Sequence, residues 1–497
     1  MKKVLALILA LLMMVALFAA CNGDKPNDGK EQQDEQGQQG EDKPNDQQSE
    51  IVIKKFDGAD YTILAKQDTK YEFEGSLGGD YVQQAVAQRT FDLENNFDVN
   101  YRLVPIPGDW GKRGEFKTAV LSEKMSGGTD GYDLIATHSI YLGWMGIEGL
   151  GKDMSLYSDY IHFDKPWWNQ NIYDELNLKG HVFMMIGDIA HTLYEYITVM
   201  FVNEAEFENY FSDDGGTEML YEMVREGEWT WSKLWEYASD FGTGASGDGK
   251  YGLATNAHAW RATFVSQEAS LFERNSEGKL SLPNTLRRKE SDIIREMTEY
   301  YAKDNIDFNV DWSIHAQYND DFTAGNILFY PQTLDQAKKL FSSENRDDYG
   351  VIPLPKYDTD QEMYKTQCRD TVTGVMLMCT TKDPERTAIL TEAMAYYGHE
   401  YVVPAYYDVS LSTRYLDQYT DILETIRAGL TYQPWDAYIQ PVSGDGNGGT
   451  MRWDKFHLIV RGNGAQADAA YQSSLSVGRS ELDNFYKKLA LLGIVYD

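Results

Sequence analysis

Asp60-Tyr-Thr-Ile-Leu-Ala65 begins the stretch that decides the fold, because its residues of high β propensity predict a strand. Helical spacing of apolar residues follows at 80–96, a second strand pattern at 97–105, a helix pattern at 115–124 and a third strand pattern at 132–136. Strands and helices in alternation predict βαβ units, and therefore a mostly parallel sheet covered by helices on both faces. Ligands of such sheets gather beyond the carboxyl ends of the strands.

Further along the chain, helix patterns become more frequent than strand patterns. Trp231 and Trp235 lie at helical spacing, so we assign both to the core. Asp383 is a capping residue, and Pro384 at the first helical position marks the start of a helix that ends near Tyr397. The other predicted elements are strands at 182–186 and 196–202 and helices at 230–238, 290–302, 334–341 and 416–428.

The N-terminus has the pattern of a secretory signal peptide, which we assign to residues 1–20. Residues 4–18 form an uncharged apolar run after a positive start, and this run is shorter than the ~20 residues of a permanent membrane span. Phe18-Ala-Ala-Cys21 resembles the bacterial lipobox, in which the chain is cut before a lipidated cysteine, although Leu is usual where Phe18 stands. The alternative is ordinary cleavage after Ala20, with Cys21 left as a chance thiol.

A polar segment follows the signal. Residues 22–50 contain no aromatic residue and no Val, Ile, Leu or Met, but many Gln, Gly and acidic residues. Such a segment cannot bury enough apolar surface to offset its ordering entropy. We therefore expect residues 21–50 to be a lipidated cysteine and a disordered acidic tether. From Ile51 onward the composition is that of a folded protein.

Charge and cysteine content exclude several classes of function. The formal net charge of −33 repels phosphate backbones and anionic lipids, so we expect no nucleic acid partner and membrane attachment only through the lipid. Besides Cys21 the chain has only Cys368 and Cys379, too few for a disulfide framework or a four-cysteine zinc site. On one extended segment these two would lie ~36 Å apart, so we expect buried free thiols unless the chain folds back between them. We expect no cofactor and no metal site.

Six short motifs occur in a characteristic order: Asp60-Tyr-Thr-Ile-Leu64, Gly131-Tyr-Asp-Leu-Ile-Ala136, Val199-Met-Phe-Val-Asn-Glu-Ala-Glu-Phe207, Gly227-Glu-Trp-Thr-Trp-Ser-Lys-Leu-Trp235, Tyr349-Gly-Val-Ile-Pro-Leu-Pro-Lys356 and Thr381-Lys-Asp-Pro-Glu-Arg-Thr-Ala-Ile-Leu390. Together they resemble the extracellular solute-binding proteins of the family 1 type, lipoproteins that deliver sugars to ABC importers. The resemblance covers nearly all of residues 55–490. It implies an α/β, two-lobed, periplasmic-binding-protein-like class II fold with a hinge and an interlobe cleft.

The resemblance also implies how the chain divides between the lobes. Lobe one comprises residues 51–198 and 372–411, and lobe two comprises residues 199–371 and 412–497. The chain is expected to cross between them near 196–201, 369–375 and 409–413, and Gly374 suits a crossing whose backbone angles change on closure. The implied partners are a sugar or other small solute and the permease subunits of the importer. We expect a lipid-anchored monomer on the extracellular face of the cell membrane.

Sugars present hydroxyl edges and weakly apolar faces, so their sites need aromatic platforms beside polar side chains. The 11 Trp and 34 Tyr residues supply such platforms, although a large core can also use them. We favour residues in loops at strand ends and at the predicted crossings. The predicted ligand-binding residues are Trp110, His138, Ser139, Asp188, Trp260, Tyr330, Arg369, Asp370 and Trp435.

Several of these residues have a structural alternative. Trp110 could be a rim contact within its lobe, and His138 a hydrogen-bonded structural residue. Asp188 could form a turn, and Arg369 and Asp370 could pair with each other. Tyr330 is placed at the cleft by the resemblance alone.

Three functions remain open at this level. The first is a carbohydrate carrier that closes over its ligand and presents it to a permease. The second is a surface-anchored glycoside hydrolase. Such an enzyme is defined by the separation in space of two catalytic carboxylates, which a sequence does not show, so this function stays open. The third is a passive adhesin or scaffold. We favour the carrier, which is not an enzyme.

Overall fold

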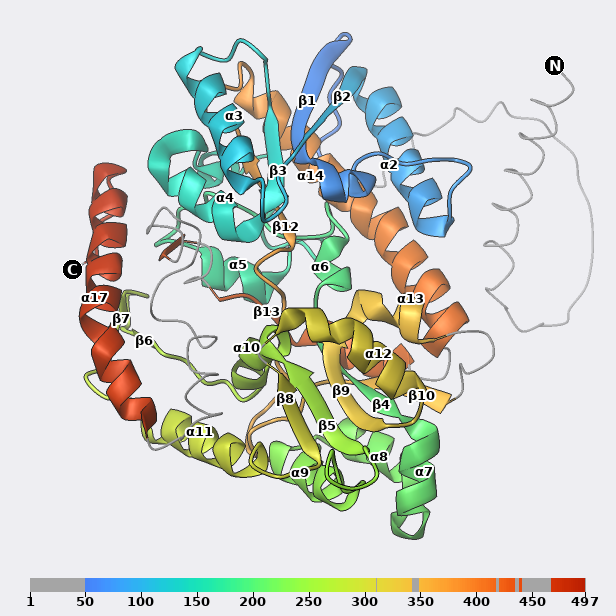
Figure 1. The fold of residues 1–497 in the computed structure, drawn as a ribbon. Coiled ribbons are helices and arrows are strands. Elements are labelled where there is room, and N and C mark those ends of the chain that lie inside the picture. Colours follow the sequence, from blue (N-terminus) through green and yellow to red (C-terminus); the bar gives the residue numbers. More distant parts are fainter. Residues whose placement is uncertain are drawn as a thin grey trace, which may run out of the picture. The chain divides into compact units, whose positions relative to one another are not determined.

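The computed structural model describes residues 50–309, 311–341, 348–416, 420–433, 438–439 and 466–496. Contacts divide the chain into two units, Met1–Gln48 and Ser49–Asp497, and the second unit contains the two main sheets (Figure 1). The predicted signal peptide, Cys21, the tether up to residue 49 and Trp435 lie outside the described residues. Within the described residues, no helix combines the length and the apolar character that a membrane crossing requires.

The first sheet has four strands in the order β12-β3-β1-β2. β1 runs parallel to β2 and β3, whereas β12 runs antiparallel to β3 and arrives from much later in the chain. Every residue of β1 from Tyr61 to Lys66 is buried, as expected for a strand covered on both faces. The strands are β1 (Ala59–Lys66), β2 (Val99–Ile106), β3 (Leu134–His138) and β12 (Thr373–Leu377).

Local signals account for the helices around this sheet. Asp80 accepts a hydrogen bond from the Gln83 backbone N–H at 2.9 Å and so begins α2, and Asp383 does the same for Arg386 at 3.0 Å in α14. The predicted start of α14 at Pro384 and its end at Tyr397 are confirmed. The helices of this part are α2 (Tyr81–Phe97), α3 (Arg113–Met125), α4 (Ser139–Met145), α5 (Gln170–Leu176), α6 (Thr192–Glu195) and α14 (Pro384–Tyr397), with shorter helical turns η1 (Gln67–Glu72), η2 (Gly146–Leu150) and η3 (Met154–Tyr157).

The second sheet has five strands in the order β10-β4-β9-β5-β8. β5 is parallel to β8 and β9, whereas β4 is antiparallel to both β9 and β10. The strands are β4 (Thr198–Asn203), β5 (Tyr251–Asn256), β8 (Ile306–Asn309), β9 (Ile327–Thr333) and β10 (Tyr349–Ile352). Two short pairs, β6 (Glu273–Arg274) with β7 (Leu280–Ser281) and β11 (Thr366–Gln367) with β13 (Leu430–Thr431), lie outside it.

Helices surround the second sheet in Figure 1, and α17 contacts α11, β7 and η2. Trp231 and Trp235 are buried on α9, which confirms their assignment to the core. The helices are α7 (Glu204–Phe211), α8 (Gly216–Arg225), α9 (Trp231–Asp240), α10 (Ala257–Ser266), α11 (Arg288–Tyr300), α12 (His315–Thr323), α13 (Ala337–Leu340), α15 (Thr420–Ala428) and α17 (Ala467–Leu491), with turns η4 (Ser212–Asp214), η5 (Trp312–Ile314) and η6 (Leu334–Gln336). The π-helical segments η8 (Gly398–Val402) and η9 (Ala405–Leu416) contact α2, beside the first sheet.

We keep the names lobe one and lobe two for the residue ranges given above. The return of β12 to the first sheet and the place of β4 in the second are compatible with that division, which stays a prediction. One local expectation is wrong. Residues 182–186 form only an isolated bridge, between Met185 and Val375, and not a strand.

Gly374 lies inside β12, paired with Thr137, and its φ is not positive. An added Cβ would meet the Leu142 side chain at 3.1 Å, so close packing favours a small residue at this position, and the change of its backbone angles on closure stays a prediction.

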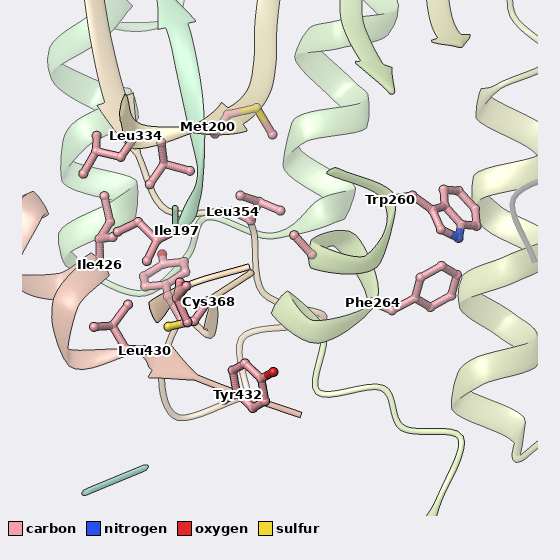
Figure 2. Packing of buried hydrophobic residues seen from close by; sticks show 14 of the residues in the cluster. Ile197, Met200, Trp260, Phe264, Leu334, Leu354, Cys368, Ile426, Leu430 and Tyr432 are labelled. Carbon is pink, nitrogen blue, oxygen red and sulfur yellow. The ribbon is translucent and has the colours of Figure 1, made fainter. Parts of the chain in front are cut away.

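Cys368 and Cys379 are free thiols, as expected. Cys368 is buried beside Leu430 (Figure 2), and its backbone forms an isolated β-bridge with Ile197. Cys379 is half-buried. Burial raises the pKa of the Cys368 thiol, so this side chain acts as a small apolar core residue.

Candidate functional site

The first sheet has a topological switch point at the carboxyl ends of β1 and β3. β1 lies between β2 and β3, so the chain crosses to the opposite side of β1 after forming β2. In open α/β sheets ligands bind at such points. Lys66 ends β1 and His138 ends β3, and because β12 is antiparallel, its first residue Thr373 is paired with His138.

His138 and Ser139 attach this edge to the segment that precedes β12. His138 Nδ1 donates to the Thr371 carbonyl at 2.9 Å, and Ser139 Oγ donates to the Asp370 carbonyl at 2.9 Å. Both side chains are buried. Burial, aided by the nearby positive charge of Lys66, lowers the pKa of His138 to about 4, so the imidazole is neutral near pH 7. Both residues lie at the predicted edge, where their side chains hold the backbone of the segment before β12.

Two aromatic rings lie beside His138. Tyr141, on α4, makes an edge contact with the imidazole at 5.7 Å between ring centroids and contacts the Trp110 ring at 5.9 Å. Trp110 is 44% exposed, and the guanidinium carbon of Arg113 lies 4.8 Å from its ring centroid. The buried Tyr141 hydroxyl has no hydrogen-bond partner among the described residues. An exposed indole beside a second aromatic ring and a guanidinium group is suited to a ligand with both apolar and polar faces.

Helix α10 reaches the same edge through one ion pair. Arg261, on α10, lies 3.1 Å from the Asp370 carboxylate, and the two side chains are only 12% and 14% exposed. Asp370 therefore pairs with Arg261. The neighbouring Arg369 donates its backbone N–H to the Tyr196 carbonyl at 3.0 Å, and burial lowers the pKa of its guanidinium. We call Trp110, His138, Ser139, Tyr141, Arg261 and Asp370 the strand-end cluster.

Trp260 and Tyr330 do not lie at this edge, and their prediction as accessible platforms is wrong. Trp260 is 0% exposed on α10, beside Phe264 at 4.9 Å and Phe308 at 5.2 Å between ring centroids (Figure 2). Tyr330 is also fully buried, within β9, and its ring contacts those of Tyr318 and Phe322. Both rings fill the core of lobe two, because their elements turn these side chains inward.

Asp188 is likewise a structural residue, and the prediction that it accepts ligand hydroxyls is wrong. Its carboxylate is 2% exposed and accepts hydrogen bonds from Tyr194 Oη and, at 2.6 Å, from His399 Nδ1. The Arg427 guanidinium lies 3.9 Å away. The hydrogen bond to Asp188 raises the pKa of His399, consistent with a charged pair. The carboxylate is thus already occupied within the chain.

The sequence did not single out Tyr141, Arg113 or Arg261. Tyr141 follows Ser139 by two residues, so its position after the third strand was a usable signal. Arg261 had none, because only the packing of α10 against the segment before β12 brings it to Asp370. Within the described part of the chain, no group of three or more His, Cys, Asp or Glu side chains is placed to hold a metal ion.

Comparison with solved structures establishes the class of fold, which is the α/β, two-lobed fold of maltose-binding-protein-like solute-binding proteins. The galacto-N-biose-/lacto-N-biose I-binding protein of an ABC transporter from Bifidobacterium longum, solved with lacto-N-biose, is similar with a TM-score of 0.54 and 13% identity over 89% of this chain and 100% of that chain. The sugar-binding protein MalE from Xanthomonas citri is similar with a TM-score of 0.55 and 11% identity, over 88% of this chain and 100% of that chain. A cyclo/maltodextrin-binding protein complexed with maltotetraose is similar with a TM-score of 0.54 and 14% identity, over 86% of this chain and 97% of that chain.

No protein-family model matches the chain, and no curated protein matches it. The similarity to solved structures therefore establishes the fold alone.

The burial of Trp260 predicts a large loss of stability on truncation. Trp260→Ala leaves a cavity among Phe264 and Phe308, and should reduce the free energy of unfolding by about 3–5 kcal/mol. Trp110→Ala, at an exposed position, should change it by less than about 0.5 kcal/mol. Urea unfolding of both variants tests this contrast, and an unchanged midpoint for Trp260→Ala would contradict the placement of Trp260 in the core.

The neutral, buried His138 predicts a specific dependence of stability on pH. Its pKa is about 4 in the folded protein against 6.5 for an ordinary histidine, so the unfolded chain binds a proton first as pH falls. Its contribution to stability is therefore fully present above pH 6.5 and is lost as pH falls toward 4. Between pH 7 and pH 5 the wild type should lose more unfolding free energy than His138→Gln does, as measured by urea titration. Equal losses would show that His138 has the ordinary pKa of a histidine in the folded protein.

Proposed function

We propose that this chain is a substrate-binding lipoprotein of an ABC importer, which captures a sugar or oligosaccharide between its two lobes and delivers it to a membrane permease. The observation that carries the proposal is the exposed Trp110 ring beside Tyr141 at the switch point of the first sheet. An aromatic face next to polar groups is what a sugar ring requires. The similar solved proteins, two of them solved with an oligosaccharide, support the same class of ligand.

Closure around the ligand is the proposed mechanism. An ion pair already joins the lobes, between Lys338 of lobe two and Glu195 of lobe one at 3.0 Å. Glu195 also accepts a hydrogen bond from Tyr71 Oη at 2.6 Å, which fixes its carboxylate within lobe one. A ligand that contacts both lobes adds differential binding energy to the closed form and shifts the population toward it. The permease then recognises the closed form.

The carboxylates around the strand-end cluster favour binding over hydrolysis. The Asp68 carboxylate accepts a hydrogen bond from Lys66 Nζ at 3.1 Å. The Asp109 carboxylate accepts hydrogen bonds from the backbone N–H groups of two residues that follow it. The Asp370 carboxylate forms an ion pair with Arg261. A glycoside hydrolase needs two carboxyl groups that face the scissile bond from opposite sides. Because these three are engaged within the chain, the site supports a carrier that leaves its sugar unchanged.

Loss of the Trp110 ring should weaken sugar binding. Trp110→Ala removes the exposed platform, and truncation of such an anchor costs on the order of 2 kcal/mol, or about thirtyfold in Kd. Calorimetric titration with maltotetraose and lacto-N-biose measures this effect. Phe91→Ala, which removes another exposed aromatic ring from lobe one, is the matched control and should bind as the wild type does. Equal affinity of Trp110→Ala and wild type for every sugar bound would contradict the proposed site.

We further propose that Cys21 carries the lipid that holds the carrier on the extracellular face of the cell membrane. The apolar run at 4–18 and the Phe18-Ala-Ala-Cys21 pattern support this, and the polar residues 22–50 then act as a tether. Cys21→Ser should release the protein into the medium and leave its sugar affinity unchanged. Cell fractionation followed by titration of the released protein tests both outcomes, and retention of Cys21→Ser in the membrane fraction would contradict lipid anchoring.

A further inference from the structure

A cavity of about 340 Å³ lies near the C-terminal end of α10, and none of its lining residues belongs to the strand-end cluster. Segments distant in sequence form its walls. Glu175 comes from α5, Glu268 and Phe272 follow α10, Arg274 is in β6, and Lys365 precedes β11. Its volume lies in the range of small-molecule sites.

Two ion pairs link these walls. Arg274 lies 2.5 Å from Glu175 and so joins β6 to α5, and Lys365 lies 4.0 Å from Glu268. The four side chains are between 26% and 42% exposed, so they face both the cavity and solvent. Two acids and two bases give a wall without net charge. Phe272, which is half-buried, adds an aromatic surface.

The walls are held in place before any ligand binds. Asn171, on α5, donates its side-chain amide to the carbonyls of Ala428 and Leu430 at 3.2 and 3.1 Å, which docks α5 against β13. Glu268 has φ of 54°, a left-handed conformation that a non-glycine residue keeps only where the surrounding structure holds it. Preorganised walls lower the entropy cost of binding.

We propose that this cavity is a second binding site, and that it takes a neutral polyhydroxylated ligand, a sugar unit. A wall of balanced charge offers no net attraction to an ion, and a charged ligand would have to compete with the two existing pairs. Hydroxyl groups do not compete, because paired carboxylates keep free lone pairs and the guanidinium and ammonium groups keep free N–H donors. The apolar face of the sugar ring packs on Phe272. The inference stands on the cavity and does not require the strand-end cluster to bind sugar.

Hydrogen–deuterium exchange of the full chain, with and without maltotetraose, lacto-N-biose and glucose, locates the site. At least one sugar should slow exchange in residues 170–176 and 265–274. Lys365→Ala and Phe272→Ala should each raise the sugar concentration at half-protection by tenfold or more. Lys233→Ala removes another ion-paired lysine, from α9, which does not line the cavity, and is the control, with no expected change. The melting temperature of each variant without sugar shows whether it is folded.

Trp110→Ala separates this site from the strand-end cluster. Protection of 265–274 that persists in Trp110→Ala supports an independent site, even where the strand-end cluster proves not to bind sugar. Three results overturn the inference: no protection of these segments by any of the three sugars, protection that both cavity variants leave unchanged, or protection that Trp110→Ala alone abolishes.

Discussion

The buried carboxylate of Glu72 is the interaction that holds together the two segments through which the chain passes between the sheets. It is fully buried, and it accepts hydrogen bonds from the Thr192 backbone N–H at 2.7 Å and from Thr373 Oγ1. Thr373 N–H in turn donates to Thr192 Oγ1 at 2.9 Å. Thr192 shortly precedes β4 and Thr373 begins β12, so one carboxylate holds both segments where the chain passes between the sheets. A buried carboxylate needs such partners, because without them desolvation would make it costly.

This network determines where the strand-end cluster forms. With Thr373 fixed beside His138, the preceding residues lie against the first turn of α4, where Ser139 Oγ donates a hydrogen bond to the Asp370 carbonyl. The Asp370 side chain is then available to Arg261 of α10. The same helix ends near the cavity that contains Glu268 and Phe272. α10 thus connects two regions that suit polar, ring-shaped ligands, one at its first turns and one at its end.

The successes and failures of the sequence predictions have a common physical cause. β1 and α14 were predicted nearly to the residue, because strand propensity and a cap of Asp383 and Pro384 act within a few positions. Trp110 was predicted as a loop aromatic, and it is exposed. Trp260, Tyr330 and Asp188 were residues of the right chemical type, yet each is buried among partners that the chain supplies from elsewhere. Residue type predicts what a side chain can do, whereas burial depends on packing between elements.

The sequence by itself determined the alternation of strands and helices in the first sheet, the starts of α2 and α14, and the core role of Trp231 and Trp235. Those features depend on periodicity and capping, which are short-range, whereas the expectation of two lobes came from the resemblance to a family. Only the tertiary structure decided that Ser139 meets Asp370, 231 residues later, that Arg261 completes the pair, and that Glu175 and Arg274 face one cavity. These contacts join residues far apart in the chain, and a linear pattern carries no record of which distant segments will pack together.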